Sequence, residues 1–222
     1  MSDPEVLYLD NHLLVVRKPA GLLIQGDRTG DPTLLEQARE YVKRRYNKPG
    51  NVFLGLVHRL DRPVSGVVVF ARTSKAASRL SEQFRTRRVN KTYLALVEGE
   101  IPQQGEFEDQ IARRETKSRI VNQGGQRAVL TFLRRSIHEG VSCVEISLGT
   151  GRHHQIRVQF AHRGYPILGD FKYGSRRPFP EKSIALLAQS LTLTHPTLQE
   201  EMTFSTEPDA YWPEAFCTKT SP

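Results

Sequence analysis

A short polar stretch between two apolar, β-rich runs holds the side chains that could do chemistry. The runs cover residues 52–57 and 67–71, and the stretch between them contains Asp61 flanked by Arg59 and Arg62. Two guanidinium groups favour the ionised form of a carboxylate and fix its direction, which makes Asp61 a candidate nucleophile or general base. The same string also fits a structural salt bridge, the more frequent outcome for such a carboxylate. The string alone leaves both interpretations open.

A second polar motif runs from Gly149 to Arg157 and resembles an anion-binding helix start. The motif lacks the Lys-Ser/Thr ending of a phosphate loop, which argues against hydrolysis of a nucleoside triphosphate. Within the motif, the adjacent residues His153 and His154 would point in different directions on a helix. The chain also has no His-Glu-x-x-His string. We therefore expect no metal site.

The elements that must position these motifs follow from hydrophobic periodicity and turn residues. Helical spacing predicts helices over 34–42, over 74–84 after Thr73 or Ser74, and over 155–163 before Gly164. Residues 110–127 read as an exposed hairpin that could close over a ligand, or as a plain surface hairpin. Strands are predicted over 6–9, 13–17, 52–57, 67–71, 92–97, 128–133, 141–148 and 184–194. This order is not a repeated βαβ unit, so we expect an α+β fold with a mixed, largely antiparallel sheet and helices packed on it.

Length and composition limit the class of protein. The 222 residues, 38% of them hydrophobic, fit one domain or two small lobes that share a core. No run of about 20 apolar residues and no signal peptide are present, which favours a soluble, intracellular protein. Two isolated cysteines, Cys143 and Cys217, favour neither a disulfide framework nor a zinc site. The reducing cytoplasm is the expected compartment.

The positive charge indicates a polyanionic partner. The net charge is +8 and the isoelectric point is near 9.7. Basic residues gather in 43–45, 85–91 and 113–119. Any one of these clusters could be a solvated face, but the three together favour nucleic acid.

Taken in order, the motifs resemble the RluA family of pseudouridine synthases over nearly the whole chain. The resemblance is carried by Lys18-Pro19-Ala20-Gly21-Leu22, by His58-Arg59-Leu60-Asp61 with Ser65-Gly66, by Lys91-Thr92-Tyr93-Leu94-Ala95-Leu96-Val97-Glu98-Gly99, by Gly151-Arg152 with His154-Gln155-Ile156-Arg157, by Gly164-Tyr165-Pro166-Ile167-Leu168-Gly169-Asp170 with Tyr173-Gly174, and by His195-Pro196. Several ordered motifs at family-like spacing make a chance match very improbable.

The resemblance implies a single catalytic domain over 1–222 with the pseudouridine synthase fold: two lobes sharing one sheet, with the active-site cleft between them. It implies isomerisation of specific uridines to pseudouridine in structured RNA, either large-subunit ribosomal RNA or transfer RNA, without cofactor or metal. The chain begins almost directly at this domain and lacks the small S4 module of many relatives, so we expect RNA contacts from the catalytic domain itself. A monomer in the cytoplasm would suffice.

The family pattern also implies roles for single residues. Asp61 matches the essential aspartate, which either attacks C1′ or acts through a glycal; Arg157 matches its basic partner, and Tyr93 the tyrosine that stacks on the uracil. Arg59 matches the arginine that fills the place of an extruded base. His58, Arg152, His154 and Gln155 are expected to support the site. Contacts to RNA are expected from Arg59, Arg62, Arg87, Arg88, Lys91, Arg113, Arg114, Lys117 and Arg119.

Two departures from the pattern and two other functions remain to be weighed. Val64 stands where the family usually has Thr, and Leu187 where it has His, which affects local hydrogen bonding rather than the reaction class. One alternative is a non-catalytic RNA-binding or ribosome assembly factor, against which intact Asp61, Tyr93 and Arg157 argue. The other is a nucleoside hydrolase or glycosidase, which would need a second paired carboxylate.

Overall fold

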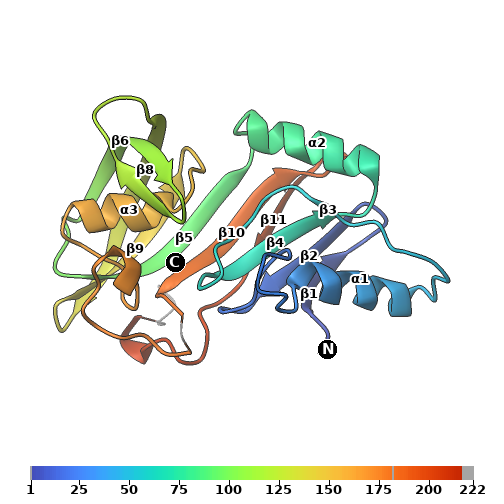
Figure 1. The fold of residues 1–222 in the computed structure, drawn as a ribbon, viewed down its shortest axis with the longest axis horizontal. Coiled ribbons are helices and arrows are strands. Elements are labelled where there is room, and N and C mark those ends of the chain that lie inside the picture. The colour runs from blue at the N-terminus through green and yellow to red at the C-terminus, as the bar shows by residue number, and fades with distance from the viewer. Residues whose placement is uncertain (1, 182, 217–222) are drawn as a thin grey trace. The chain divides into compact units, whose positions relative to one another are not determined.

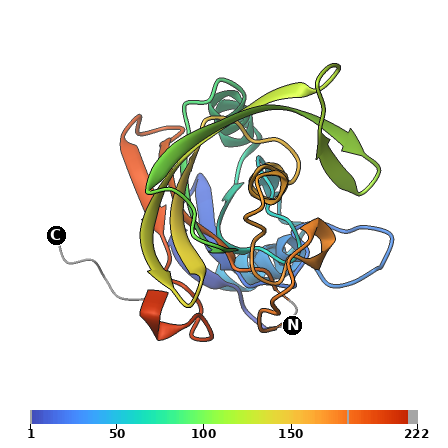
Figure 2. The ribbon, with the colours of Figure 1, turned by 90° about the vertical axis from the view of Figure 1, so that its left-hand side faces the viewer.

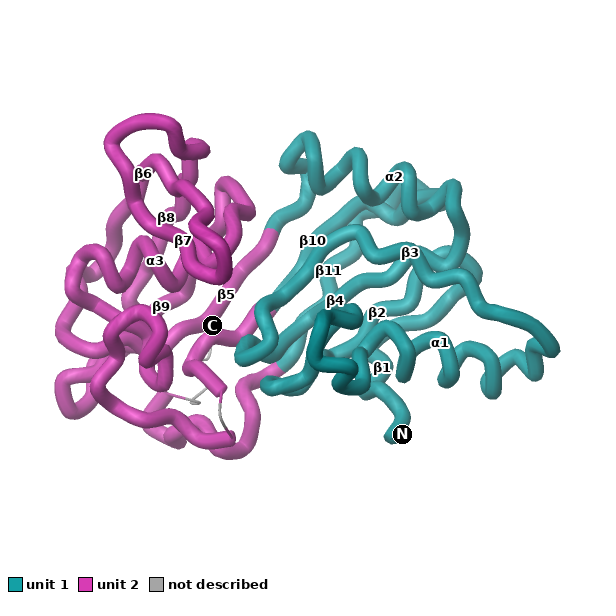
Figure 3. Tube along the Cα trace, in the orientation of Figure 1, with its two compact units in different colours: residues 1–90, 190–206 teal, residues 91–189, 207–222 magenta. Residues whose placement is uncertain are grey.

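The computed structural model describes residues 2–181 and 183–216. The chain divides into two compact units, drawn in different colours in Figure 3. Unit 1 consists of residues 1–90 and 190–206, and unit 2 of residues 91–189 and 207–222. That the units share one sheet around a cleft stays a prediction. None of the helices among the described residues has the length and apolar character needed to cross a membrane.

The strands of unit 1 pair antiparallel. The N-terminal hairpin joins β1 (Glu5–Leu9) to β2 (Leu13–Lys18), and β2 pairs with β4 (Ser65–Ala71). The short β3 (Gly55–Leu56) pairs with the end of β4. From the far end of the chain, β10 (Leu186–Thr194) contributes residues 190–194, which pair with β11 (Glu201–Ser205). All seven residues of β4 are buried, as expected for a strand covered on both faces.

Two capped helices belong to unit 1 (Figure 1). Helix α1 (Leu34–Arg45) begins with a capping box, in which Thr33 and Glu36 each accept a hydrogen bond from the other's backbone N–H. Helix α2 (Ser74–Arg85) begins after Thr73, whose hydroxyl accepts from the N–H of Ala76 over 3.1 Å. The structure selects Thr73, not Ser74, as the cap.

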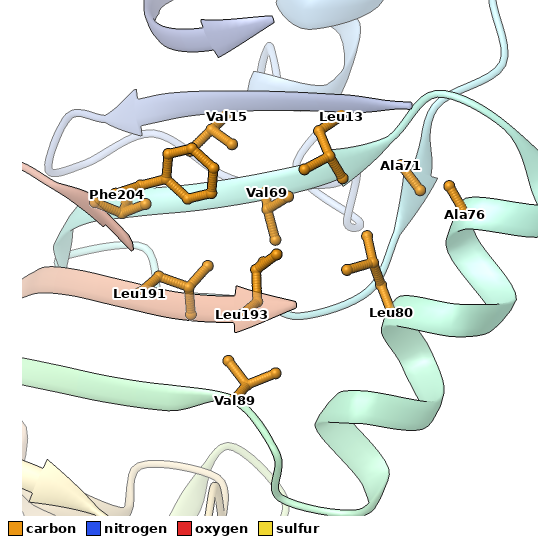
Figure 4. Close-up of a cluster of buried hydrophobic side chains, with 11 residues drawn as sticks. Leu13, Val15, Val69, Ala71, Ala76, Leu80, Val89, Leu191, Leu193 and Phe204 are labelled. Carbon is orange, nitrogen blue, oxygen red and sulfur yellow. The ribbon is translucent and has the colours of Figure 1, made fainter. Parts of the chain in front are cut away.

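The core of unit 1 joins the two ends of the sequence. Figure 4 shows Leu13 and Val15 of β2 against α2 and against Leu191, Leu193 and Phe204 of the C-terminal strands. The ring nitrogen Nε2 of His195, which is fully buried, lies 2.9 Å from Oδ2 of Asp10 in the turn of the first hairpin. Because side chains alternate along a strand, Leu14, Val16, Val68 and Phe70 fill the opposite face, where Figure 1 shows α1.

Unit 2 is a curved antiparallel sheet around one helix. Its strand order is β5-β9-β8-β6-β7. Figure 2 shows the strands curving around α3 (Gln155–His162). Two short 3-10 helices follow, η1 (Phe171–Tyr173) and η2 (Glu214–Phe216). The strands are β5 (Asn90–Glu98), which enters unit 2 at Lys91, β6 (Gln104–Arg114), β7 (Lys117–Ile120), β8 (Gln126–His138) and β9 (Val141–Leu148).

The predicted α+β class and the three predicted α-helices are confirmed. The prediction of a strand over 52–57 is wrong for most of its length, because only residues 55–56 pair. The hairpin predicted at 110–127 exists, but its first arm is the end of the longer β6, and β8 begins at Gln126. Cys143 is buried in β9, whereas Cys217 lies outside the described residues.

Candidate active site

Asp61 lies in the loop that connects β3 to β4 in unit 1. Its carbonyl oxygen accepts a hydrogen bond from the N–H of Val64 over 3.1 Å, which closes a turn directly before β4. Nε2 of His58 accepts from the N–H of Val69 over 3.0 Å, and the His58 ring stacks on Phe84 of α2 with centroids 4.8 Å apart. The loop is therefore fastened at its first residues to both β4 and α2. These contacts suit the supporting role of His58, which stays a prediction.

A buried lysine holds the other side of the same loop. Lys18, at the end of β2, is fully buried, and its Nζ donates to the carbonyl oxygens of Pro19 over 2.9 Å and of Arg62 over 3.0 Å. Burial lowers the pKa of Lys18 to about 7, an effect that the nearby Asp61 carboxylate opposes and the Arg62 guanidinium adds to. The motif that begins with Lys18 thus shapes the backbone around Asp61.

Arg62 is a further tie between this motif and the loop. Its carbonyl oxygen accepts from the N–H of Gly21 over 2.8 Å, and its Nε donates to the carbonyl oxygen of Gly21 over 2.9 Å. A salt bridge of 2.8 Å joins its guanidinium to Asp31. The side chain remains exposed, as does that of Arg59. Arg62 is therefore structural in the loop, while its exposed charge can still meet a ligand.

Tyr93 lies in unit 2, on the face of the sheet that α3 covers. It pairs with Ile146 of β9, and Ile146 pairs in turn with Phe132 of β8. Paired residues share a face of the sheet, and the Phe132 ring packs edge-on against Phe160 of α3 at 5.8 Å. Tyr93 is half-buried. It therefore projects toward the helix that carries Arg157.

Arg157 is almost fully buried and forms a two-point ion pair with Asp170. Its Nε donates to Oδ2 over 2.7 Å and its Nη2 to Oδ1 over 2.8 Å. The exposed fractions of the two side chains are 6% and 1%. Geometry of this kind fixes the plane of a guanidinium. Asp61 belongs to unit 1 and Arg157 to unit 2, so the pairing of these two residues stays a prediction.

Gln155 shapes the turn before α3. Its Oε1 accepts from the hydroxyl of Thr150 over 2.7 Å and from the N–H of Arg152 over 3.0 Å. Its Nε2 donates to the carbonyl oxygen of Val129 over 3.1 Å, which ties the turn to β8. The side chain of Arg152 donates to the carbonyl oxygen of Arg127 over 3.0 Å. Both residues therefore have the geometry of the supporting role predicted for them.

His154, the last residue before α3, has left-handed backbone angles and makes no side-chain cap. Its Nδ1 lies 2.8 Å from the hydroxyl of Tyr173 in η1, and that hydroxyl oxygen accepts from the N–H of Ser118 in β7. His154 thus links the helix start to two other elements of unit 2. No metal role is needed to explain it, and no group of three or more His, Cys, Asp or Glu residues in the described ranges could hold a metal ion.

The predicted RNA contacts divide between the units. Arg59, Arg62, Arg87 and Arg88 belong to unit 1, and all four are exposed. In unit 2, Lys91 stands at the start of β5, with its Nζ close to Gly151 of the turn before α3. Four other cations lie on the arms of β6 and β7 between residues 111 and 120, which we call the basic hairpin: Arg113, Arg114, Lys117 and Arg119. All of them except Lys91 and Lys117 are exposed.

Reasoning from sequence missed three side chains that organise the site. Lys18, Asp170 and Tyr173 all stand inside the quoted motifs, but no role was assigned to them. The signal for Lys18 is its position two residues after Val16, which places it on the same face of the strand as the buried Leu14 and Val16. Asp170 and Tyr173 gave no signal of this kind, because their partners are reached only through the fold.

Comparison with known proteins identifies the family of the chain. A family model described as RNA pseudouridylate synthase matches residues 12–162. Ribosomal large subunit pseudouridine synthase D of Xanthomonas campestris pv. campestris is 37% identical over 211 residues, which cover 88% of this chain and 63% of that protein. The chain thus spans less than two thirds of that relative's length.

Other relatives match over almost their full length. The tRNA pseudouridine synthase C of Haemophilus ducreyi is 32% identical over 241 residues, covering 96% of this chain and 94% of that protein. The solved structure of human RNA pseudouridylate synthase domain containing 4 has a TM-score of 0.76 and 26% identity, covering 96% of this chain and 90% of that one. Because the family model matches residues 12–162, about two thirds of the 222 residues, the chain belongs to the RNA pseudouridylate synthase family.

Proposed function

We propose that the chain is an RNA pseudouridine synthase that isomerises specific uridines in structured RNA. The observation that carries the proposal is the family match over residues 12–162, which includes Asp61, Tyr93 and Arg157 together. The matched relatives are named for large-subunit ribosomal RNA and for transfer RNA. Both classes of RNA are therefore candidate substrates, and the surplus of positive charge suits either one.

The proposed catalytic residues are Asp61, Tyr93 and Arg157. Asp61 comes from unit 1 and the other two from unit 2, so their common site in a cleft is proposed from the family pattern rather than from a distance. Supporting contacts lie within each unit. Side chains from β2 and α2 fix the Asp61 loop, and Asp170 fixes the guanidinium of Arg157. Preorganisation of this kind is what positioning catalysis requires.

The proposed reaction conserves all atoms of the uridine. The glycosidic bond between C1′ and N1 breaks, the uracil turns while it stays bound, and C5 forms a bond with C1′. The proton of C5 is then lost, and N1 gains one, so the product is an isomer of the substrate. The protein has to hold the detached base, exclude water and stabilise the charge that develops on the sugar.

Each proposed residue answers one of these needs. The Asp61 carboxylate either attacks C1′ or removes a sugar proton to give a glycal. A positive charge from Arg157 favours the ionised form of that carboxylate. The ring of Tyr93 offers a face on which the uracil can stack. A uridine inside a stem must first leave its stack, and the exposed Arg59 is the side chain that we propose to fill the vacated place.

The decisive experiment maps pseudouridine after incubation with unmodified ribosomal and transfer RNA. We expect carbodiimide-dependent reverse-transcription stops with the wild-type protein and none with Asp61→Asn. Asp27→Asn serves as the matched control, because Asp27 is exposed and accepts its hydrogen bonds from Thr29 within its own loop. This variant should give the wild-type stops, and the stops will name the RNA.

Two other results would replace the proposal. Tight RNA binding without any stops would favour the non-catalytic RNA-binding or assembly factor. Release of free uracil without pseudouridine would favour the hydrolase.

All proposed roles lie in one chain, so we also propose a monomer, which light scattering during gel filtration would test. The cytoplasm is the proposed compartment, where fractionation of the source cells should find it.

A further inference from the structure

Tyr173 lies where three elements of unit 2 meet: η1, the start of α3 and strand β7. The side chain is buried, and its hydroxyl oxygen accepts a hydrogen bond from the N–H of Ser118 over 2.8 Å. The same hydroxyl lies 2.8 Å from Nδ1 of His154. The hydroxyl and the ring nitrogen are within hydrogen-bond distance, and the tautomer of the His154 ring sets which of them donates. One hydroxyl therefore bridges β7 and the helix start.

Ser118 makes a second connection to the same place. It is 1% exposed, and its hydroxyl lies 2.6 Å from the carbonyl oxygen of His153 and 2.9 Å from Nδ1 of that residue. The rings of His153 and His154 stack with centroids 3.8 Å apart, so the prediction that they point in different directions is wrong, because both residues precede α3. The strand that carries Ser118 is thus fastened through backbone and side chain to the two residues before α3.

These contacts fix the basic hairpin, residues 111–120. Ile111 and Ile120 pair across it and pack toward Val158 of α3 and the Tyr173 ring. Since Ser118 shares their face, the alternation of the strand places Arg119 on the opposite one. Arg119 is exposed there. Apolar residues and Ser118 therefore hold one face of the hairpin, where Arg113 pairs with Ser118, and Arg114 and Arg119 belong to the other face.

The ring of Tyr173 also contacts Arg157, the proposed partner of the catalytic aspartate. The guanidinium carbon of Arg157 lies 5.1 Å from the ring centroid, and the ammonium of Lys117 in the hairpin lies 5.0 Å from it. Both distances suit cation–π attraction. One side chain therefore sets the position of the basic hairpin relative to the helix that carries Arg157.

We propose that Tyr173 is a positioning residue for RNA, which holds the cations of the basic hairpin at a fixed distance from the α3 start so that they meet RNA phosphates together. A hairpin that is ordered before binding loses less conformational entropy when RNA binds, and its cations engage phosphates in one register. The inference rests on the proposed function in that RNA is the ligand. It does not depend on catalysis.

The test measures RNA binding as a function of salt. The probes are fluorescently labelled, unmodified transcripts of transfer RNA and of large-subunit ribosomal RNA, and the Kd is followed by anisotropy over a KCl series. Tyr173→Phe removes the hydroxyl but keeps the ring, so the packing and both cation–π contacts should survive. We expect its Kd to rise about tenfold. The slope of log Kd against log salt should fall by roughly one or more, which corresponds to the loss of at least one phosphate contact.

A double-mutant comparison separates positioning from a general loss of stability. If Tyr173 positions the hairpin, Arg119→Ala should weaken binding in the wild-type background and have little further effect beside Tyr173→Phe. Tyr46→Phe is the matched control, because it removes an exposed hydroxyl in unit 1 that accepts a hydrogen bond from Arg72. That variant should bind as the wild type does. Thermal melts establish that each variant is folded. If Tyr173→Phe is not, Ser118→Ala removes the second tie of the hairpin, the contacts of the Ser118 hydroxyl with His153, and should weaken RNA binding in the same way.

The outcomes are distinct. An unchanged Kd and salt slope in folded Tyr173→Phe would overturn the inference, as would an Arg119→Ala effect of the same size in both backgrounds. Absence of RNA binding by the wild type would also overturn it. If binding follows Tyr173 as expected but no RNA gains pseudouridine, the inference stands and the proposed reaction fails.

Discussion

Replacing Lys18 by methionine tests whether the buried amine beside the Asp61 loop is neutral in the folded protein. Burial lowers the pKa of Lys18 from 10.5 to about 7. Between these two values the unfolded chain holds a proton on this lysine that the folded chain has lost. Unfolding therefore takes up a proton, and the contribution of Lys18 to the free energy of unfolding rises as the pH increases from about 7 toward 10.5.

The expected size follows from the linkage relation. One proton gained on unfolding changes the free energy of unfolding by up to ~1.4 kcal/mol per pH unit. Between about pH 7.5 and pH 9.5, wild type should gain on the order of 2–3 kcal/mol relative to Lys18→Met. At the higher pH the neutral amine still donates to the carbonyl oxygens of Pro19 and Arg62. In Lys18→Met these two carbonyl oxygens lose that donor.

The assay is urea unfolding of both proteins at the two pH values and equal ionic strength. Equal m-values are required, because a changed m-value reports a change in the surface exposed on unfolding. Lys48→Met, which removes an exposed lysine, is the control and should show no such pH-dependent difference. A difference between wild type and Lys18→Met that stays constant with pH would refute the reasoning. The attraction of Asp61 would then outweigh burial and keep Lys18 charged.

Three further predictions concern the scaffold of the site. Asp170→Asn should lower the free energy of unfolding by about 3 kcal/mol, because it leaves the buried Arg157 cation uncompensated. Chemical denaturation measures this loss. The same variant should reduce kcat for pseudouridine formation, which single-turnover kinetics measure. Burial raises the pKa of the Glu98 carboxyl, but hydrogen bonds from Ser175 and from two backbone N–H groups outweigh burial and hold this pKa below its usual range. The resulting stabilisation is present above the unfolded-state pKa and is lost as pH falls through the folded-state pKa. Glu98→Gln should therefore flatten the acid limb of a Tm-against-pH curve. Thr33→Ala should lower stability by about 1 kcal/mol in a denaturant titration through loss of the α1 cap, while an unchanged midpoint would show that the cap contributes nothing.

Local signals were sufficient for the elements that bury an apolar stripe. Helix α2 follows its predicted bounds because Thr73 caps it and its Ala76 and Leu80 reach the core. Strand β6 was not predicted over its length, since only Phe107 and Ile111 among its residues are buried apolar side chains. Its extended form comes from pairing with β8, which a local pattern does not contain.

The same distinction applies to the candidate site. Arg157 was found by its motif, but its ion pair with Asp170, 13 residues away, depends on the turn that follows α3. The bond between Ser118 and Tyr173 spans 55 residues and requires the hairpin to fold back on the helix start. Chemical type and spacing therefore point to candidate site residues, whereas their long-range hydrogen-bond and ion-pair partners can be recognised only in the folded structure.

The core of unit 1 has a consequence for synthesis on the ribosome. Leu191, Leu193 and Phe204 complete an apolar face that Leu13 and Val15 begin, and residues 91–189 are made in between. At ~5–20 residues per second, that interval lasts about 5 to 20 s. The face built from the first strands therefore waits uncovered while unit 2 emerges, and a chaperone has time to bind it. Emergence of Ser190–Thr206 from the ribosome is the event that allows unit 1 to close.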